Sequence, residues 1–248
     1  MTLRRPRLIP RLAIKGDSVV VTVNMEGLRK VGKPTDLARQ YANQDIDELL
    51  YLDVVASLYG RNQLESLIEE TCAEVFVPIT VGGGIASCEA AKSLLRAGAD
   101  KVAINTAAIQ SPDLITRVAD QFGSQALVVS IEAKRVNGGW EAYTENGRQR
   151  TGKEAIAWAH EVERLGAGEI LLTSIDKDGT MKGPDLELAR QIKVGIPVVL
   201  AGGIGTPNQA TQAARVSDAI AIGAALHYGK TTIREVKEAL MGAGKEVR

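Results

Sequence analysis

The stretch Val81-Gly-Gly-Gly-Ile85 joins an apolar segment, 77–81, directly to a helical pattern that begins near Ser87. Glycines at such a junction leave the backbone N–H groups of the helix start accessible, and phosphate groups bind at helix starts of this kind. A second copy, Ala201-Gly-Gly-Ile204, follows the apolar segment 196–200. The two copies lie about half the chain apart, and this spacing indicates an internal duplication.

Apolar strands and amphipathic helices alternate on both sides of these turns. Strands rich in Val, Ile and Leu that are each followed by a helix indicate a parallel sheet buried on both faces. The predicted strands span 8–14, 48–54, 77–81, 101–105, 127–132, 169–174, 196–200 and 218–222. The predicted helices span 35–43, 62–73, 88–97, 111–122, 153–165, 185–193, 207–215 and 232–241, with Thr35, Ser87 and Ser111 as N-cap residues. Two excursions follow the first and fifth strands, a strand and loop at 18–27 and a hairpin at 136–150.

Eight strand–helix units in a chain of 248 residues predict a closed (β/α)8 barrel. An open, doubly wound sheet is the alternative, but it gives no reason for two halves that match throughout. Glu48-Leu-Leu corresponds to Glu169-Ile-Leu, and Ala99-Asp-Lys corresponds to Ser217-Asp-Ala. We therefore expect one α/β domain over residues 1–248, a (β/α)8 TIM barrel built from two duplicated half-barrels.

The composition limits the partners and the location of the protein. The 30 basic and 30 acidic side chains cancel, so the net charge gives no indication of nucleic-acid binding. The basic segment 1–7 has no apolar signal-peptide run, and no segment approaches the length of a membrane span. Cys72 and Cys88 lie on predicted helices and suggest neither a disulfide framework nor a metal site. We expect a cytoplasmic protein without metal, cofactor or membrane contact.

The two glycine turns predict two anion sites on opposite sides of one barrel mouth. Such a pair suits a long substrate with a phosphate at each end. The alternative is that the glycines only form tight strand-to-helix turns, but two matched copies favour phosphate binding. The residues that flank the turns and follow neighbouring strands are Gly84, Asn105 and Thr106 on one side and Gly179, Gly203 and Gly223 on the other.

General acid–base chemistry in this fold needs titratable side chains at the ends of strands. Carboxylates at such places are Asp53, Glu132, Asp176 and Asp178. In the duplication, Glu132 at the end of the fifth strand corresponds to Ala13 at the end of the first. A symmetric site would hold two carboxylates, whereas this one holds a single carboxylate.

Three other titratable side chains are further candidates for the site. His160 lies on a predicted helix, and for His227, which follows the last strand, a capping or packing role is favoured. Arg11 shares a strand face with Arg7 and Ala13, so it points into the barrel unless the strand is shifted by one residue. A buried charge must be paired, and Glu132 and Glu48 are the two candidate partners. If the strand is shifted by one residue, Arg11 instead faces helices or solvent.

Several motifs together strongly resemble the cyclase subunit of imidazole glycerol phosphate synthase. They cover nearly the whole chain and include Leu8-Ile-Pro-Arg-Leu12, Asn24-Met-Glu-Gly-Leu-Arg29, Thr80-Val-Gly-Gly-Gly-Ile85, Phe122-Gly-Ser-Gln125 and Glu132-Ala-Lys-Arg135. The resemblance implies a half-barrel duplication that receives ammonia from a glutaminase subunit docked on the barrel bottom. It also implies reaction of that ammonia at the mouth with a ribulosyl formimino aminoimidazole carboxamide ribonucleotide, a bisphosphate.

The resemblance also assigns roles to single residues. It implies a bottom gate for ammonia at Arg7, Glu48, Lys101 and Glu169, a glutaminase-docking surface at Asp100 and Gln125, and phosphate binding at the six residues named above. The chain departs from the family at the catalytic pair of aspartates, which falls on Ala13 and Glu132. A loop lysine is Val21, a cysteine is Arg11, and a serine before the second glycine turn is Ala201.

These departures leave several functions open. The chain could be a cyclase that is impaired by Ala13, with Glu132 transferring protons and Asp178 or Asp53 replacing the missing carboxylate. It could be a paralogue that passes ammonia to another acceptor, such as the amidino sugars of surface polysaccharides. It could be an engineered barrel in which Glu132 is a lone general base for proton abstraction. Finally, it could be a non-catalytic partner that only binds a glutaminase, as a heterodimer.

Overall fold

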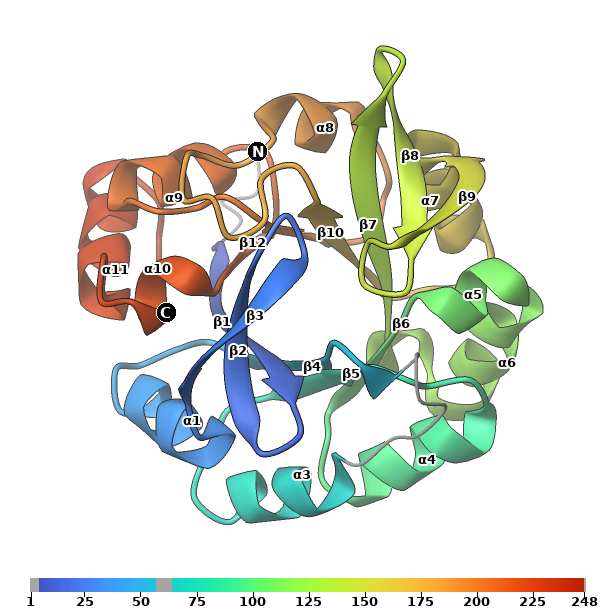
Figure 1. Cartoon of the computed structure of the whole chain (residues 1–248), viewed down its shortest axis with the longest axis horizontal. Helices are drawn as coiled ribbons and strands as arrows, with labels where there is room; N and C mark the ends of the chain where they lie inside the picture. Colours follow the sequence, from blue (N-terminus) through green and yellow to red (C-terminus); the bar gives the residue numbers. More distant parts are fainter. Residues whose placement is uncertain (1–4, 57–63, 248) are drawn as a thin grey trace.

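The computed structural model describes residues 5–56 and 64–247. Within these residues, eight parallel strands form a closed barrel surrounded by helices (Figure 1). The barrel strands are β1 (Arg7–Lys15), β4 (Leu49–Asp53), β5 (Ile79–Gly82), β6 (Lys101–Ile104), β7 (Leu127–Val136), β10 (Glu169–Ser174), β11 (Val198–Ala201) and β12 (Ala219–Ile222). β12 pairs with β1 and β7 pairs with β10, so the ring of strands has no free edge. The predicted TIM barrel is confirmed.

The two excursions occupy matching places in the two halves of the barrel. β1 continues into an antiparallel hairpin of β2 (Ser18–Val23) and β3 (Glu26–Gly32), and β7 continues into β8 (Gly139–Thr144) and β9 (Gln149–Glu154). Both hairpins extend the first strand of their half, as the duplication requires. The sequence predicted β2 and the second hairpin but missed β3, because its exposed residues are mostly polar and glycine.

The helices cover the outside of the barrel. They are α1 (Pro34–Ala42), α3 (Glu65–Cys72), α4 (Cys88–Arg96), α5 (Thr106–Gln110), α6 (Asp113–Phe122), α7 (Ala155–Arg164), α8 (Leu186–Gln191), α9 (Pro207–Ala213), α10 (Ala224–His227) and α11 (Ile233–Gly242), with a short 3₁₀ turn at Ser124–Ala126. The start of the helix predicted over 62–73 lies outside the described residues. The short α5 and α10 were not predicted, and they again hold matching places, after β6 and β12.

Of the three predicted N-caps, one is confirmed. Ser87 caps α4, since its hydroxyl accepts a hydrogen bond from the Ala90 N–H at 3.2 Å. The prediction of Thr35 as an N-cap was wrong. Helix α1 already begins at Pro34, whose fixed φ suits the first helical position. Ser111 was also wrong, because it follows α5, and α6 starts at Asp113 after Pro112.

The hydrophobic core has two layers, because the barrel strands bury both faces. The outer layer lies between strands and helices and includes the fully buried Leu94 and Trp158. The inner layer fills the barrel and alternates bulky and small side chains, namely Ile9, Leu50, Ala103, Val128, Leu171, Val199, Ala201, Ala219 and Ala221. The inner layer takes side chains from seven of the eight barrel strands, all except β5, and separates the strand starts from the mouth.

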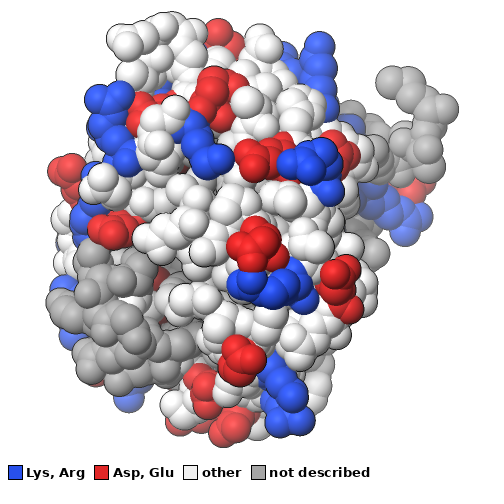
Figure 2. All heavy atoms as spheres, turned by 90° about the vertical axis from the view of Figure 1, so that its right-hand side faces the viewer, with Lys and Arg blue, Asp and Glu red and all other residues white. Residues whose placement is uncertain are grey.

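The outer surface mixes charges of both signs. On the face displayed in Figure 2, Lys and Arg side chains lie next to Asp and Glu side chains. Among the described residues, no helix combines the length and apolar character that crossing a bilayer requires.

Candidate active site

A ring of four charged side chains, the gate ring, closes the bottom of the barrel. Its members stand at or just before the first residues of their strands and are Arg7, Glu48, Lys101 and Glu169. Arg7 bonds both Glu48 and Glu169. The Lys101 ammonium lies 3.2 Å from a Glu48 oxygen and 2.9 Å from a Glu169 oxygen. Each cation therefore touches both carboxylates, and the alternating ring is fully paired.

An open depression of about 550 Å³ borders three members of the gate ring, Arg7, Lys101 and Glu169, at the bottom of the barrel. Gln125, one of the two expected docking residues, lines it together with Arg7, Lys101 and Glu169. Asp100, the other, is exposed, and its carboxylate accepts a hydrogen bond from the Ile79 N–H at 2.8 Å. Asp218 holds the Val198 N–H in the same way at 2.9 Å in the other half. Asp100 thus has a structural contact of its own, whatever binds beside it.

Two pockets open at the opposite end of the barrel, where the strands finish. The first pocket, of about 240 Å³, is lined by Gly84, Asn105, Thr106, Asp53 and Glu132 among others. Asn105 and Thr106 also hold the β8–β9 hairpin, because Asn105 donates to the Tyr143 carbonyl at 3.3 Å and Thr106 accepts from the Glu145 N–H at 3.2 Å. The structure therefore brings the first set of expected phosphate residues and Glu132 into one cavity.

Glu132 is the titratable group of the first pocket with a perturbed acidity. Its carboxylate accepts a hydrogen bond from the Gly147 N–H at 2.7 Å. Burial raises the pKa of Glu132 from 4.5 to about 7, and the charge of Asp178 adds to this effect. The Gly147 hydrogen bond and the charge of Arg11 lower the pKa and offset part of the rise. A carboxyl group with a pKa near neutrality can both accept and donate a proton at physiological pH.

Asp53 lines the same pocket, but its carboxylate is engaged by the backbone. It accepts hydrogen bonds from the Val55 and Ala56 N–H groups, each at 2.9 Å, and so forms the turn after β4. Gly83 packs against this turn, since a Cβ there would lie 2.5 Å from the Asp53 carbonyl oxygen. The tight-turn interpretation therefore holds for Gly83, next to a cavity that remains open to a ligand.

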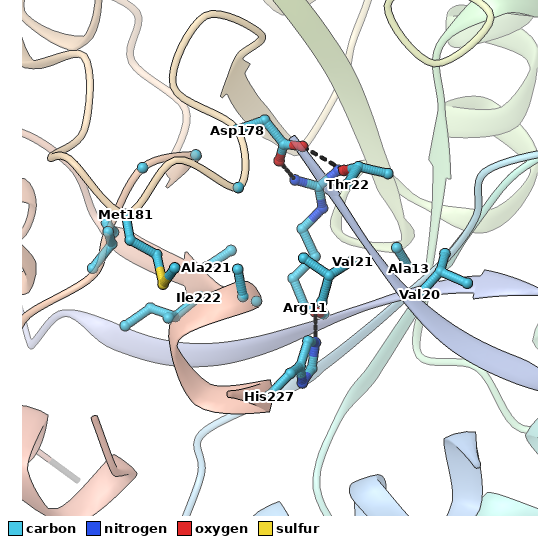
Figure 3. Close-up of a pocket in the computed structure, with 16 residues that line it drawn as sticks. Arg11, Ala13, Val20, Val21, Thr22, Asp178, Met181, Ala221, Ile222 and His227 are labelled. Carbon is cyan, nitrogen blue, oxygen red and sulfur yellow. Dashed lines mark hydrogen bonds and ion pairs between the residues drawn. The ribbon is translucent and has the colours of Figure 1, made fainter. Parts of the chain in front are cut away.

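The second pocket lies under the β2–β3 hairpin and is smaller, about 40 Å³ (Figure 3). Gly179, Gly203 and Gly223, the second set of expected phosphate residues, all line it. Ala13 and Arg11 line it as well, from the inward face of β1. Gly179 must be glycine, because a Cβ there would collide with the Thr22 carbonyl oxygen and its φ is +69°. The hairpin thus rests directly on the loop that follows β10.

Arg11 crosses the second pocket and pairs with Asp178 (Figure 3). Its Nη1 lies 2.7 Å from Asp178 Oδ1, and the Thr22 hydroxyl donates to Asp178 Oδ2 at 2.6 Å. The prediction that Glu132 or Glu48 pairs with Arg11 was wrong. Glu48 belongs to the gate ring, and the Glu132 carboxylate is bonded to Gly147. The inward orientation of Arg11 is confirmed, since it lines the pocket at the mouth and is in register with Leu50 of the inner layer.

The pairing changes the place of Asp178 in the site. Both of its oxygens are occupied, one by a cation and one by a hydroxyl, and the residue is 5% exposed. Asp176, the neighbouring candidate, instead accepts from the Arg135 N–H at 2.8 Å and so supports the β7 extension. Among these three carboxylates, Glu132 is therefore the one that lines the first pocket.

His227 supports Arg11 from below. Its Nε2 lies 3.0 Å from the Arg11 carbonyl oxygen, and its Nδ1 lies 2.7 Å from the Tyr41 hydroxyl. A carbonyl can only accept, so Nε2 carries the proton and Nδ1 accepts from Tyr41. Burial and the charge of Arg11 lower the pKa of His227 to about 4, against a hydrogen bond to Arg11 that raises it. His227 is neutral near pH 7 and acts as a packing residue, as the sequence favoured.

The sequence analysis missed the contacts that hold the β2–β3 hairpin against the loop after β10 and against the β8–β9 hairpin. The Asn24 N–H donates to the Asp178 carbonyl at 2.8 Å, and the Asn146 side chain donates to the Met25 carbonyl at 3.3 Å. Met25 is buried with Tyr143 and Ile175. The sequence does contain a signal for the burial of this loop, because an apolar Met next to Asn is unusual in a solvent-exposed turn. The mouth is thus roofed by loops from both halves.

Comparison with known proteins gives a consistent result. A family model described as "Histidine biosynthesis protein" matches residues 7–232. The imidazole glycerol phosphate synthase subunit HisF of Legionella pneumophila is 57% identical over 202 residues, 80% of this chain and 95% of that protein. The proteins of the same name from Dehalococcoides mccartyi and Pyrococcus furiosus are 46% and 45% identical, over 98% of this chain and 97% and 98% of their own lengths.

Proposed function

This chain belongs to the histidine biosynthesis family, and we propose that it is the cyclase subunit of an imidazole glycerol phosphate synthase. One observation carries the proposal beyond the family: a fully paired gate ring at the bottom of the barrel stands opposite the Glu132 pocket at the mouth. A cyclase that receives ammonia at one end and uses it at the other needs both.

We propose that the bottom face binds a glutaminase subunit, as a heterodimer. The open depression around the gate ring supports this, because it exposes Gln125 beside the charged ring. Asp100 is exposed on a neighbouring strand start. A partner docked there would cover the gate ring and deliver ammonia to it.

At the mouth, the substrate we propose is a bisphosphate ribonucleotide that spans both pockets. Gly84, Asn105 and Thr106 line the pocket for one phosphate, and Gly179, Gly203 and Gly223 line the pocket for the other. Glu132 lies in the first pocket with a pKa near neutrality. In this proposal Glu132 takes and returns protons while ammonia adds and the imidazole ring closes.

The reaction of this chain is slower than that of a cyclase with two carboxylates. Position 13 is alanine, and its methyl group packs with Val20 and Val54. Loss of one partner in acid–base catalysis costs ~10² to 10⁴ in rate. Asp53 and Asp178 are the nearest candidates to compensate, but both are engaged, Asp53 by backbone N–H groups and Asp178 by Arg11.

The test is cyclase activity with an ammonium salt as the nitrogen source, before and after Ala13→Asp. We expect weak activity in the natural chain and recovery of at least tenfold in the variant. Ser18→Asp is the matched control, because it adds the same charge to the adjacent strand of the hairpin, away from the mouth. If cyclase activity is undetectable both in the unsubstituted chain and in Ala13→Asp, the cyclase proposal is refuted.

The altered mouth favours a second candidate, a paralogue that transfers ammonia to another acceptor. Arg11 and Ala13 change the charge and the shape of the second pocket while the gate ring stays complete. Mixing the chain with a glutaminase tests this directly. Stimulation of glutamine hydrolysis, without turnover of the ribonucleotide by either the natural chain or Ala13→Asp, would support an amidino-sugar or related acceptor in place of the cyclase reaction.

A further inference from the structure

Arg11 is a buried cation whose hydrogen-bonding capacity is largely unused. Its side chain is 9% exposed, and Nη1 bonds Asp178. Nε is buried and has no hydrogen-bond partner among the described residues. A buried N–H group without an acceptor costs about 1–3 kcal/mol, so such groups are rare unless a ligand or a water completes them.

The guanidinium geometry places the free donors together. Nη1 stands on the same side of the planar group as Cδ, so Nε and Nη2 share the other edge. Such an edge donates two parallel hydrogen bonds, which match the two oxygens of a carboxylate or of a phosphate. The edge bonded to Asp178 through Nη1 is therefore distinct from the edge that carries the unpaired Nε.

The surroundings suit an anion that is small. Ala13, Val20 and Val21 give the second pocket apolar walls next to Arg11 (Figure 3). A position occupied by alanine leaves space on the inward face of β1, two residues beyond Arg11. Desolvation by such walls strengthens a charge-assisted hydrogen bond.

The charges around the pocket leave Arg11 available. His227 touches the backbone of Arg11 and is neutral near pH 7, so no second cation competes for an anion. Asp178 is already satisfied by Arg11 and Thr22. Glu132 is within range of the charge of Arg11, but its carboxylate is bonded to Gly147 rather than to Arg11.

We propose that the Nε–Nη2 edge of Arg11 binds an oxyanion in the second pocket and that Arg11 is a specificity-determining residue for the acid group at this end of the substrate. A chain with an uncharged side chain at position 11 would bind this end through backbone groups alone. The proposal rests on the proposed function only in taking the ligand to be the substrate.

The experiment follows the Nε–H signal of Arg11 by ¹H–¹⁵N NMR while inorganic phosphate or acetate is added, with sodium chloride at equal ionic strength as the blank. The signal is assigned from its loss in Arg11→Lys, or from its loss in Arg11→Gln if the lysine variant does not fold. Arg11→Lys keeps a cation beside Asp178 but removes the pair of parallel N–H donors on the Nε–Nη2 edge. Arg29→Lys, at an exposed position of β3, is the matched control.

We expect phosphate or acetate to shift the Arg11 signal. Binding by the variants is followed through the backbone N–H signals of Gly203 and Gly223, which line the same pocket, and should be at least tenfold weaker in Arg11→Lys and unchanged in Arg29→Lys. A response to phosphate alone identifies a phosphate end, and a response to acetate alone identifies a carboxylate. No shift with either anion at tens of millimolar, or equal binding by Arg11→Lys, would overturn the proposal. Because the experiment measures binding, its outcome is independent of the proposed function. A shift of the Arg11 signal without cyclase activity supports the oxyanion site but not the cyclase, whereas cyclase activity without a shift supports the cyclase but refutes the oxyanion site.

Discussion

Replacement of Glu132 by glutamine should make the protein more stable at alkaline pH, although it removes a hydrogen-bonded carboxylate. Burial raises the pKa of Glu132 from 4.5 to about 7. In the unfolded chain this carboxyl ionises near its ordinary pKa, whereas in the folded protein it stays protonated until about pH 7. The unfolded state therefore releases its proton first, and the free energy of unfolding falls as the pH rises from 4.5 through 7.

The size of the effect follows from the two pKa values. They differ by an amount that corresponds to about 3 kcal/mol at ~1.4 kcal/mol per pKa unit. Glutamine carries no charge, and its side-chain oxygen can still accept the hydrogen bond from Gly147. The stability of Glu132→Gln relative to the natural chain should consequently increase by about 2–3 kcal/mol between pH 5 and pH 8.

The assay is urea-induced unfolding of both proteins at pH 5 and pH 8, which yields the free energy of unfolding by linear extrapolation. Glu70→Gln, at an exposed position of α3, is the control, and it should change the free energy of unfolding equally little at both pH values. If Glu132→Gln changes stability by the same amount at pH 5 and pH 8, then Glu132 is not a buried acid with a raised pKa, and its proposed role in proton transfer near neutrality loses its basis.

Three further substitutions probe the roof and the floor of the barrel. Gly179→Ala should lower the free energy of unfolding by more than 2 kcal/mol through collision with the hairpin, whereas Gly138→Ala, also at positive φ but in open space, should cost ~1 kcal/mol; equal losses in thermal melts would contradict this. Thr22→Val should remove ~1 kcal/mol by deleting the bond to Asp178 and should speed hydrogen exchange across β2 and β3. Glu169→Gln should cost about 3 kcal/mol in urea unfolding, because it leaves two half-buried cations to share one carboxylate.

The gate-ring prediction has an internal control. Glu238→Gln breaks an ion pair of the same type with Arg234, but that arginine is 86% exposed. Exposed pairs contribute little, so the control should change the free energy of unfolding by less than ~1 kcal/mol. A similar loss in both variants would mean that burial adds nothing to the gate ring.

The barrel could be predicted from the sequence because its signals are local and repeated. Each buried parallel strand is a short apolar run, and the matching glycine turns at Gly83 and Gly202 tie the two halves together. Elements without such local signals were not predicted. β3 has an exposed, polar pattern, and α5 and α10 are too short to show helical periodicity.

The candidate site was predicted in its parts but not in its pairings. Alternation along β1 correctly turned Arg11 inward, since side chains of a strand alternate between faces. The choice of its partner failed, because Asp178 lies on a loop whose path no periodicity fixes. Thr22 and Asn24 were missed for the same reason, as their contacts with that loop depend on how the hairpin folds back.

The inner layer of the barrel also acts as an electrical insulator. Ile9, Leu50 and Leu171 stand two residues beyond the gate ring on three of its strands, and the side chains clustered with them are apolar. The polar exception at this level is the buried hydroxyl of Thr80, which is in register with Leu50. A small ion that enters such surroundings loses ~20 kcal/mol of hydration by the idealised estimate, whereas a neutral molecule does not. In the cyclase that we propose, ammonium would therefore lose its proton at the bottom of the barrel, and the mouth would receive neutral ammonia, whose lone pair is ready to react.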